Sequence, residues 1–261
     1  MRGTIRRIPL RRRLVADLMW ASEGVPLITY QRRLGLAPLA QARARLTSPP
    51  GFAAIIAKAF ALVAREQPVL RTLVMDFPWS HFYELPRCVG VIAIARQIDG
   101  EDCVLAQKVV APDELSLACV DGLIREAQSA PVEEVPMFRK MMRISALPWP
   151  LRRFIWWGGL SLARQRANYF GSFGLSSVSA IGAGDLYPIS PGPYMLSFGR
   201  LDEDGGLDMV IRFDHRLIDA APIARIMTRL EQVLNTAITS ELQAMQRGPA
   251  AAKPPVRAVG A

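Results

Sequence analysis

The chain has 261 residues, of which 51% are hydrophobic and 21% are charged. At roughly 100–200 residues per domain, this length fits one large domain or two small ones, and the composition excludes global disorder. The 32 Lys and Arg against 23 Asp and Glu give a net charge of +9. Such a surplus suits an anionic partner: a phosphorylated cofactor, an acidic carrier protein, a membrane surface or nucleic acid.

The sequence also favours some compartments over others. The N-terminus is basic but lacks the apolar run and the small-residue cleavage site of a signal peptide. No stretch approaches 18 uninterrupted apolar residues, so a transmembrane helix is not expected. The 3 cysteines have neither metal-ligand nor disulfide spacing, which indicates a reducing compartment. We therefore expect a cytoplasmic protein.

Residue patterning predicts alternating helices and strands along the chain. The clearest helix is 52–66, which is apolar almost all round and is expected to be buried. Asp99-Gly100 predicts a hairpin turn, and Asp113 is a good N-cap for the helix that follows. The predicted helices cover 10–22, 38–46, 52–66, 113–128 and 221–242, and the predicted strands cover 25–31, 88–96, 103–110, 172–182, 193–201 and 207–215.

The order of these elements indicates α/β layers with a partly antiparallel sheet. We expect one catalytic domain over 1–246 and a disordered Pro/Ala-rich tail over 247–261.

An unusual stretch, 137–170, combines Met, Phe, Trp and Leu with clusters of arginine. From 135 to 184 there are seven basic residues, no acidic residue and three of the five tryptophans. A basic amphipathic segment with tryptophans is typical of a membrane-interface element, so an anionic membrane surface is one predicted partner of 137–166. Alternatively, the apolar face packs on the domain or on a neighbouring subunit, or covers a long acyl chain.

The chain has two histidines that could serve as a general base near neutral pH. His81 lies in a proline-flanked segment that we interpret as a loop. His215 ends a predicted strand and precedes a predicted helix, where a rigid element can present a side chain to a cleft. Asp219 is four residues further on, and Arg216 is adjacent. No P-loop, GxGxxG motif, metal-ligand cluster or nucleic-acid-binding motif is present, so neither a metal nor nucleic acid is expected.

The segment Asp214-His215-Arg216-x-x-Asp219 resembles the His-x-x-x-Asp-Gly motif of the chloramphenicol acetyltransferase-like fold. It is most similar to that of the catalytic domains of dihydrolipoamide acyltransferases, the cores of 2-oxo acid dehydrogenase complexes. Further similar segments are IPLRRRLVADLM (8–19), FAAIIAKAFALVAREQPVLR (52–71), the stretch 88–128, and GSFGLSSVSAIGAGDLYPISPGP (171–193). The resemblance covers roughly residues 8–242 apart from 131–168.

The resemblance implies a two-layer α/β fold with a mixed, largely antiparallel sheet, assembled as a homotrimer with sites between subunits. It implies an acyltransferase in which His215 takes a proton from the acceptor and Ser176, with Ser177 beside it, stabilises the oxyanion. Asp219 completes the catalytic set and pairs with an N-terminal arginine that matches Arg11. The donor is acyl-CoA or an acyl carrier protein, so coenzyme A is a co-substrate and no cofactor is covalently bound.

Three departures from the family leave alternatives open. Ala220 replaces the motif's Gly, and it should strain the turn if that position needs positive φ. The chain has no lipoyl domain and no subunit-binding domain, so it is expected to use a free acceptor or a carrier supplied in trans. The stretch 137–170 is insert-like, and it favours a lipidic acceptor or acyl chain. The alternatives are a non-catalytic trimeric scaffold and a trans-acting component of a 2-oxo acid dehydrogenase complex.

Overall fold

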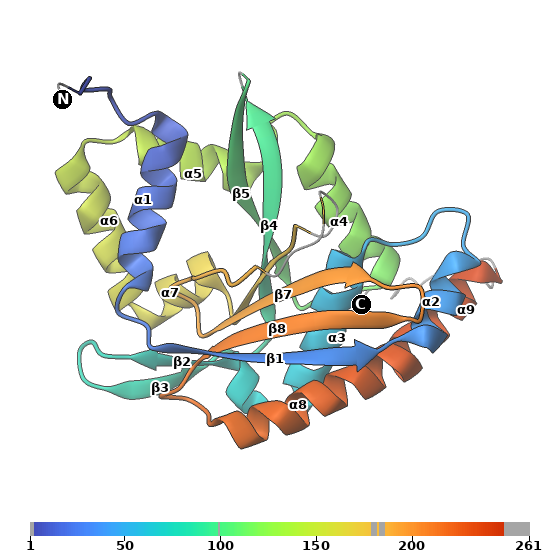
Figure 1. The fold of residues 1–261 in the computed structure, drawn as a ribbon. Coiled ribbons are helices and arrows are strands. Elements are labelled where there is room, and N and C mark those ends of the chain that lie inside the picture. The colour runs from blue at the N-terminus through green and yellow to red at the C-terminus, as the bar shows by residue number, and fades with distance from the viewer. Residues whose placement is uncertain (1–2, 99, 179–181, 183–185, 248–261) are drawn as a thin grey trace, which may run out of the picture.

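The computed structural model describes residues 3–98, 100–178, 182 and 186–247 (Figure 1). A mixed six-stranded sheet with the order β1-β8-β7-β6-β4-β5 organises the chain, and a separate hairpin pairs β2 with β3. The β4–β6 and β6–β7 pairs are parallel, whereas β1–β8, β7–β8 and β4–β5 are antiparallel. The strands are β1 (Leu27–Gly35), β2 (Thr72–Met75), β3 (His81–Glu84), β4 (Val89–Ile98), β5 (Glu101–Val110), β6 (Phe173–Ser176), β7 (Tyr194–Leu201) and β8 (Gly206–Asp214).

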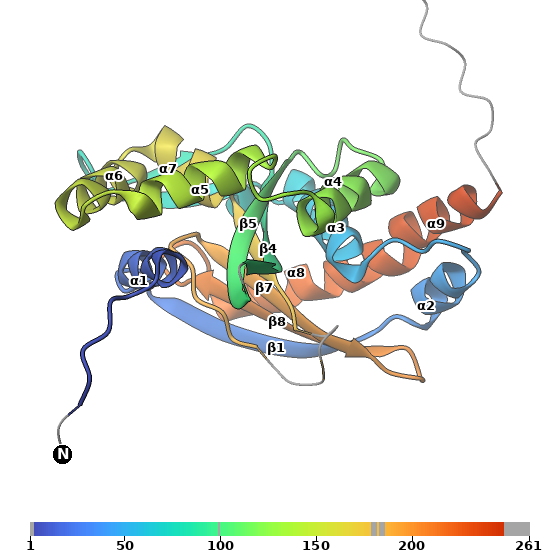
Figure 2. The same ribbon diagram turned by 90° about the horizontal axis from the view of Figure 1, so that it is seen from above.

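Helices cover both faces of this sheet: α3, α4 and α8 pack on one face, and α5, α6 and α7 cover the cavity on the other. In Figure 2, α5, α6 and α7 lie to the left of β4 and β5, α3 and α4 lie to the right, and α1 lies under α5 and α6. A 3-10 turn at Pro68–Arg71 follows α3, and a π-helical turn at Leu234–Ile238 joins α8 to α9. The helices are α1 (Leu10–Ser22), α2 (Ala37–Ala44), α3 (Phe52–Glu66), α4 (Leu117–Ser129), α5 (Pro136–Ala146), α6 (Trp149–Ser161), α7 (Ala163–Phe170), α8 (Ala220–Val233) and α9 (Thr239–Gln246).

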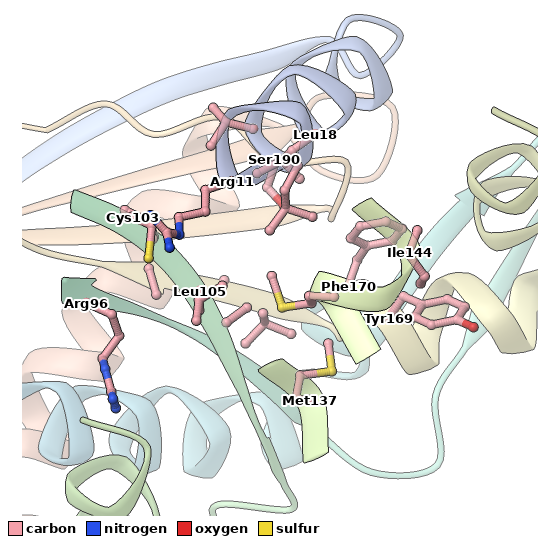
Figure 3. Close-up of a pocket in the computed structure, with 18 of the residues that line it drawn as sticks. Arg11, Leu18, Arg96, Cys103, Leu105, Met137, Ile144, Tyr169, Phe170 and Ser190 are labelled. Atoms are coloured by element: carbon pink, nitrogen blue, oxygen red, sulfur yellow. The ribbon is translucent and has the colours of Figure 1, made fainter. Parts of the chain in front are cut away.

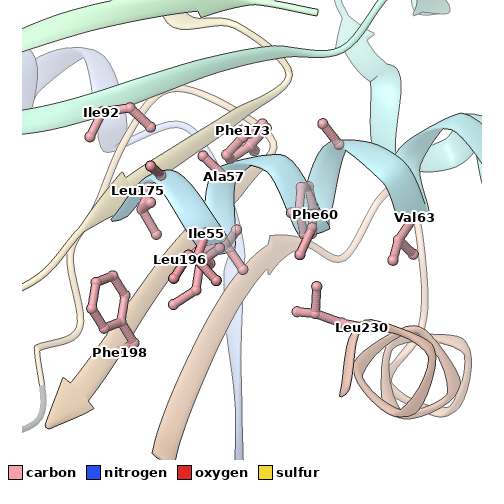
Figure 4. Close-up of a cluster of buried hydrophobic side chains, with 14 of the residues drawn as sticks. Ile55, Ala57, Phe60, Val63, Ile92, Phe173, Leu175, Leu196, Phe198 and Leu230 are labelled. Atoms are coloured by element: carbon pink, nitrogen blue, oxygen red, sulfur yellow. The ribbon is translucent and has the colours of Figure 1, made fainter. Parts of the chain in front are cut away.

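The main core lies between α3 and the sheet (Figure 4). The helix is buried almost all round, as its apolar sequence predicts, and it packs against α4, α8, β4 and β6. The Phe60 ring lies 4.8 Å from the ring of Phe173 on β6, and it also contacts Tyr194 on β7. Burying such aromatic side chains contributes several kcal/mol each, because Phe-to-Ala changes in cores cost about 3–5 kcal/mol. The core therefore fixes β6 and β7, the strands that lead to the candidate site.

Most predicted elements are confirmed, and their differences have local causes. The helix expected over 113–128 begins at Leu117, because Ser116, not Asp113, is the N-cap and its side chain accepts a hydrogen bond from the Cys119 amide at 3.2 Å. The strand expected over 25–31 spans Leu27–Gly35, and the helix expected over 221–242 contains the π-helical turn. The segment containing His81, interpreted as a loop, forms the β2–β3 hairpin.

Two expectations fall partly outside the described residues. Of the strand expected over 172–182, the structure shows Phe173–Ser176, and 179–181 lie outside the described residues. The predicted disordered tail lies outside them as well, from 248 onward. The insert-like stretch is folded into α5, α6 and α7. Within the described part of the chain, no helix is long and apolar enough to span a membrane.

Candidate functional site

His215 is held in a short turn between β8 and α8. The strand ends at Asp214 and the helix begins at Ala220, so the histidine leaves the sheet at a fixed point. Its backbone amide donates to the carbonyl oxygen of Pro26 at 3.3 Å, beside the start of β1, and the Asp214 amide donates to the Pro193 carbonyl oxygen at 2.8 Å. These two hydrogen bonds connect the turn to the residues just before β1 and β7, the two neighbours of β8 in the sheet.

The hydrogen bonding of the His215 ring defines which nitrogen can act as a base. Nδ1 lies 3.0 Å from the carbonyl oxygen of Ile218 and 3.3 Å from Oδ1 of Asp219. A carbonyl oxygen only accepts hydrogen bonds, so Nδ1 must carry the proton, and in the neutral ring Nε2 is the unprotonated nitrogen. The side chain is 44% exposed, so the ring is accessible to another molecule. The arrangement fits a general base that acts through Nε2.

Asp214 and Arg216 brace the turn on either side of His215. Asp214 is buried, and its carboxylate accepts two hydrogen bonds from the Arg216 guanidinium, at 3.0 Å from Nε and 2.7 Å from Nη2. These hydrogen bonds raise the pKa of Arg216 above its ordinary value. The bidentate geometry is the strong form of an arginine–carboxylate pair. This pair was not predicted from the sequence, although the acid and the arginine that flank the histidine are visible there.

The structure places Asp219 and Ala220 at the end of the same turn. Asp219 precedes α8, and its side chain approaches Nδ1 of His215 instead of capping the helix. Ala220 is the first residue of α8 and is exposed, and it is not among the described residues with positive φ. The strain considered for Ala in place of Gly is therefore not found, because a helical backbone accepts any L residue at this position.

Arg11 and Asp219 are not brought together within one chain. Arg11 lies near the start of α1, where its guanidinium pairs with Glu101 of β5 at 3.1 Å. The His215 turn adjoins β1, beyond the other end of α1. A helix rises about 1.5 Å per residue, so most of the length of α1 separates Arg11 from that turn. The expected Arg11–Asp219 pair is thus corrected for the single chain to an Arg11–Glu101 pair.

Ser176 and His215 also lie apart in one chain. Ser176 is the last residue of β6, and the sheet register places it beside Ser197 of β7, which in turn faces Val210 of β8. Val210 precedes His215 by five residues. At about 3.4 Å per residue, the two side chains are separated by about 17 Å along the strands. A single chain therefore does not assemble the predicted set of His215, Ser176 and Asp219.

The stretch 137–170 contains buried arginines with structural partners. Arg152 of α6 is buried, and its Nε lies 2.9 Å from Oδ2 of Asp17, which is buried on α1. Arg166 of α7 is also buried and donates to the carbonyl oxygens of Val74 at 3.0 Å and Pro191 at 2.8 Å. Burial lowers the pKa of Arg166 from its ordinary value. These arginines are thus part of the packing, which a sequence pattern of alternating Arg and Trp did not reveal.

A large apolar cavity lies beneath this stretch (Figure 3). It has a volume of about 860 Å³ and is bounded by α1, β4, β5, α5, α6 and α7. The alternative that 137–170 covers a long acyl chain was predicted from the sequence, but the residues that line the cavity were not. The sequence of β4 contains a signal for the cavity, because large and small apolar residues alternate along it. Ile92 and Ile94 are buried in the core, whereas the smaller Val91 and Ala93 line the cavity.

The described residues offer no metal site, and the buried thiol of Cys88 is not activated. No group of three or more His, Cys, Asp or Glu side chains among them could hold a metal ion. The three cysteines are free, and burial raises the pKa of the Cys88 thiol to about 12. A thiol with such a pKa remains protonated at neutral pH and is a poor nucleophile.

Comparison with solved structures identifies the class of fold: the chain has the chloramphenicol acetyltransferase-like fold, as found in the catalytic cores of dihydrolipoamide acyltransferases. It is similar to the dihydrolipoamide acetyltransferase of Azotobacter vinelandii, with a TM-score of 0.62 and 19% identity over 92% of this chain and 95% of that one. That protein was studied for the catalytic roles of a serine, a histidine and an asparagine.

Two further structures have the same architecture. A probable dihydrolipoamide acetyltransferase from Listeria monocytogenes has a TM-score of 0.61 and 14% identity, covering 89% of this chain and 94% of that one. A truncated catalytic core of the 2-oxoacid dehydrogenase complex from Thermoplasma acidophilum has a TM-score of 0.60 and 17% identity, covering 90% of this chain and 99% of that one. No protein-family profile and no curated protein sequence matches the chain. At these identities the likeness establishes the fold.

Proposed function

We propose that the protein is an acyltransferase that moves an acyl group from acyl-CoA or an acyl carrier protein to a hydroxyl, thiol or amine acceptor. The observation that carries the proposal is the geometry of His215. Its Nδ1 is held by the Ile218 carbonyl oxygen, which leaves Nε2 as a base on an accessible ring. The fold supports the same conclusion, because catalytic cores of acetyltransferases share it.

The proposed reaction uses His215, Ser176 and Asp219. Nε2 of His215 takes the proton of the acceptor, whose oxygen, sulfur or nitrogen attacks the thioester carbonyl carbon. The carbonyl oxygen becomes an oxyanion, to which the Ser176 hydroxyl donates a hydrogen bond; such a donor is worth about 10²–10³ in rate. The carbon–sulfur bond then breaks, and the imidazolium returns the proton to the leaving thiolate. Asp219 is a positioning residue that also stabilises the imidazolium, because its carboxylate lies 3.3 Å from Nδ1.

The active form is a homotrimer with each site between two subunits. The separation of Ser176 and His215 within one chain supports this proposal, because a working site needs both groups within reach of one thioester. His215 of one copy then faces Ser176 of the next. The pair of Arg11 and Asp219 that the family resemblance implies is not formed inside one chain either, so the proposal of sites between subunits includes it. Coenzyme A is a co-substrate in this scheme, attracted by the net charge of +9.

The outer surface of α6 supports contact with an anionic membrane by a cytoplasmic protein. Trp149, Phe154 and Trp157 are at least half exposed, and the Phe154 and Trp157 rings stack with centroids 6.0 Å apart. Exposed basic side chains at Arg139, Lys140, Arg143 and Arg164 lie in the same stretch. Aromatic rings with nearby cations are typical of interfacial segments. Flotation with anionic vesicles, but not neutral ones, is expected, and loss of flotation in a Phe154→Ala/Trp157→Ala variant checks the assigned surface.

The decisive experiment follows the release of CoA by the purified protein with a thiol reagent, for donors from acetyl-CoA to palmitoyl-CoA. Wild type and His215→Ala are compared, since both retain the same cysteines. His215-dependent release is expected. If both proteins are inactive with every donor, including acyl carrier protein thioesters, the scaffold alternative holds. Activity restricted to dihydrolipoamide and short acyl groups would instead support the trans-acting complex component.

A further inference from the structure

The cavity beneath the insert-like stretch has the size and lining of a ligand site. Its volume of about 860 Å³ lies within the range of roughly 300–1,000 Å³ of small-molecule sites, whereas ordinary protein interiors contain few voids larger than a water molecule. Most of its lining is apolar, and neither His215 nor Asp219 is among the lining residues. The cavity is therefore distinct from the histidine turn.

The floor of the cavity is formed by small residues of the sheet and its roof by helices, and the small floor residues leave the space open. The floor is the face of the sheet opposite α3, where Val91, Ala93 and Gly174 present small side chains or none. A Cβ at Gly174 would meet the sulfur of Met195, which would have to move aside. The roof comes from α5, α6 and α7. Met137, Met141 and Met195 all contact the cavity, and their flexible thioethers adapt to a mobile apolar chain.

The two ends of the cavity differ in polarity. Arg11, Arg12 and Arg96 are the basic lining residues, Asp102 is the single acidic one, and Figure 3 shows Arg11 and Arg96 at one end. Arg11 is paired with Glu101, and Arg96 donates to the carbonyl oxygens of Ala127 and Ala130, whereas Arg12 is exposed. Figure 3 shows Tyr169, Phe170 and Ile144 at the opposite end. A ligand that fits has an anionic head and a long apolar tail.

We propose that this cavity holds the hydrocarbon chain of a long-chain acyl group, with the phosphates of its coenzyme A or the carboxylate of a fatty acid toward Arg11 and Arg12. The proposal deepens the acyltransferase function and rests on it for the identity of the ligand as a substrate. Ser176 follows Gly174 by two residues and so lies on the same face of β6. The pairing of β4 with β6 ends at Ile92 and Leu175, so Ser176 lies one residue beyond it. An acyl chain in the cavity thus leaves its carbonyl on the face of the sheet that carries Ser176.

Direct binding tests this proposal without any need for turnover. Octanoate, laurate and palmitate are titrated into the purified full chain in a calorimeter. Each further methylene that enters the cavity is expected to tighten binding by about fourfold. Cys103 lines the cavity and Cys119 is exposed, so alkylation followed by peptide mass spectrometry gives a second readout. Palmitate is expected to protect Cys103 at least tenfold while Cys119 reacts at an unchanged rate.

Three variants separate the cavity from the catalytic groups. Ala93→Phe fills the floor and is expected to weaken palmitate binding by at least tenfold. Ala16→Phe is the matched control, because Ala16 is exposed on α1 and does not line the cavity. His215→Ala is expected to bind palmitate as wild type does while losing CoA release, so failure of the catalytic proposal and failure of the cavity proposal give different patterns.

Three results would overturn the assignment of the cavity. One is binding that does not depend on chain length. Another is palmitate binding that leaves Cys103 as reactive as before. The third is a palmitate affinity that the Ala93→Phe substitution leaves unchanged. His215-dependent turnover of acetyl-CoA without any palmitate binding would retain the acyltransferase and remove the long-chain site.

Discussion

A backbone carbonyl, rather than a carboxylate alone, holds the histidine of the candidate site. Because Nδ1 donates to the Ile218 carbonyl oxygen, the protonation pattern of the neutral ring does not depend on Asp219. The carboxylate contributes charge instead, and it becomes important when His215 has accepted a proton. The bidentate pair of Asp214 and Arg216 fixes the backbone on both sides of the ring. Preorganisation at this turn thus comes mainly from contacts that sequence motifs do not show.

Ser176 and Ser177 are adjacent hydroxyls with different predicted roles. Ser177 donates to the Phe198 carbonyl oxygen at 2.8 Å and is expected to be structural, whereas Ser176 is assigned to the oxyanion. Ser176→Ala is expected to lower kcat by about 10²–10³ with little change in KM. Ser177→Ala is the matched control and is expected to change kcat by less than about threefold. Steady-state kinetics with the best donor check both, and equal losses would refute the assignment.

The buried thiol of Cys88 predicts a dependence of stability on alkaline pH. Burial raises its pKa from the ordinary value near 9 to about 12, so the folded state retains a proton that the unfolded state loses first. Stability from this group is complete below about pH 9 and declines as pH rises toward 12. The slope from one such group is at most little more than about 1 kcal/mol per pH unit. Urea unfolding between neutral pH and about pH 10 should show a shallower decline for Cys88→Ala than for wild type.

At the scale of elements, α1 and α6 are joined by a buried ion pair. Asp17 of α1 is 1% exposed and Arg152 of α6 is 7% exposed, and Arg153 stacks on Trp20 of α1 with its guanidinium carbon 4.1 Å from the ring centroid. These contacts fix two helices that bound the cavity. The insert-like stretch is therefore attached to the domain through charge as well as through apolar packing.

Breaking this pair on one side is expected to destabilise the protein. Asp17→Asn leaves the Arg152 guanidinium buried without a carboxylate, which costs about 3 kcal/mol or more. Glu66→Gln is the matched control, because the Glu66–Arg229 pair between α3 and α8 has the same type of partners but is 44% exposed on both sides. A cost below about 1 kcal/mol is expected for it. Urea unfolding of both variants tests the difference, and equal costs would contradict the structural role of the buried pair.

Elements with strong local signals could be predicted from the sequence, and those set by distant contacts could not. The apolar run of α3 and the hairpin pattern of β4 and β5 were predicted nearly to the residue, because their own side chains determine them. The β2–β3 hairpin was missed because Phe77, Pro78 and Trp79 in its connection read as an irregular loop. For the site, the His motif predicted His215 and Asp219, and the similar segment 171–193 predicted Ser176; their roles stay predictions. The Asp214–Arg216 pair, the buried arginines and the cavity depend on packing between segments far apart in the chain.

At the scale of the whole molecule, the proposed acyltransferase activity is expected to depend on assembly, because the groups assigned to it lie apart in one chain. Arg11 and Ser176 lie toward the cavity side of the sheet, whereas His215 and Asp219 lie at the turn beside β1. A closed cyclic assembly repeats the same contact at every interface, so each copy can supply one half of a site to its neighbour. Sedimentation of the purified protein should therefore give a trimer, and dissociation to monomers should abolish CoA release.

Hybrid assemblies decide whether a site contains groups from two subunits. His215→Ala and Ser176→Ala chains, each nearly inactive alone, are co-expressed in equal amounts so that mixed assemblies form. If each site takes His215 from one copy and Ser176 from the next, about one quarter of the sites are intact, and about one quarter of wild-type activity returns. If both groups acted within one chain, every chain would lack one of them, and activity would stay at the level of the single variants. Separately purified chains that are mixed without subunit exchange provide the control, because they contain the same polypeptides without shared interfaces.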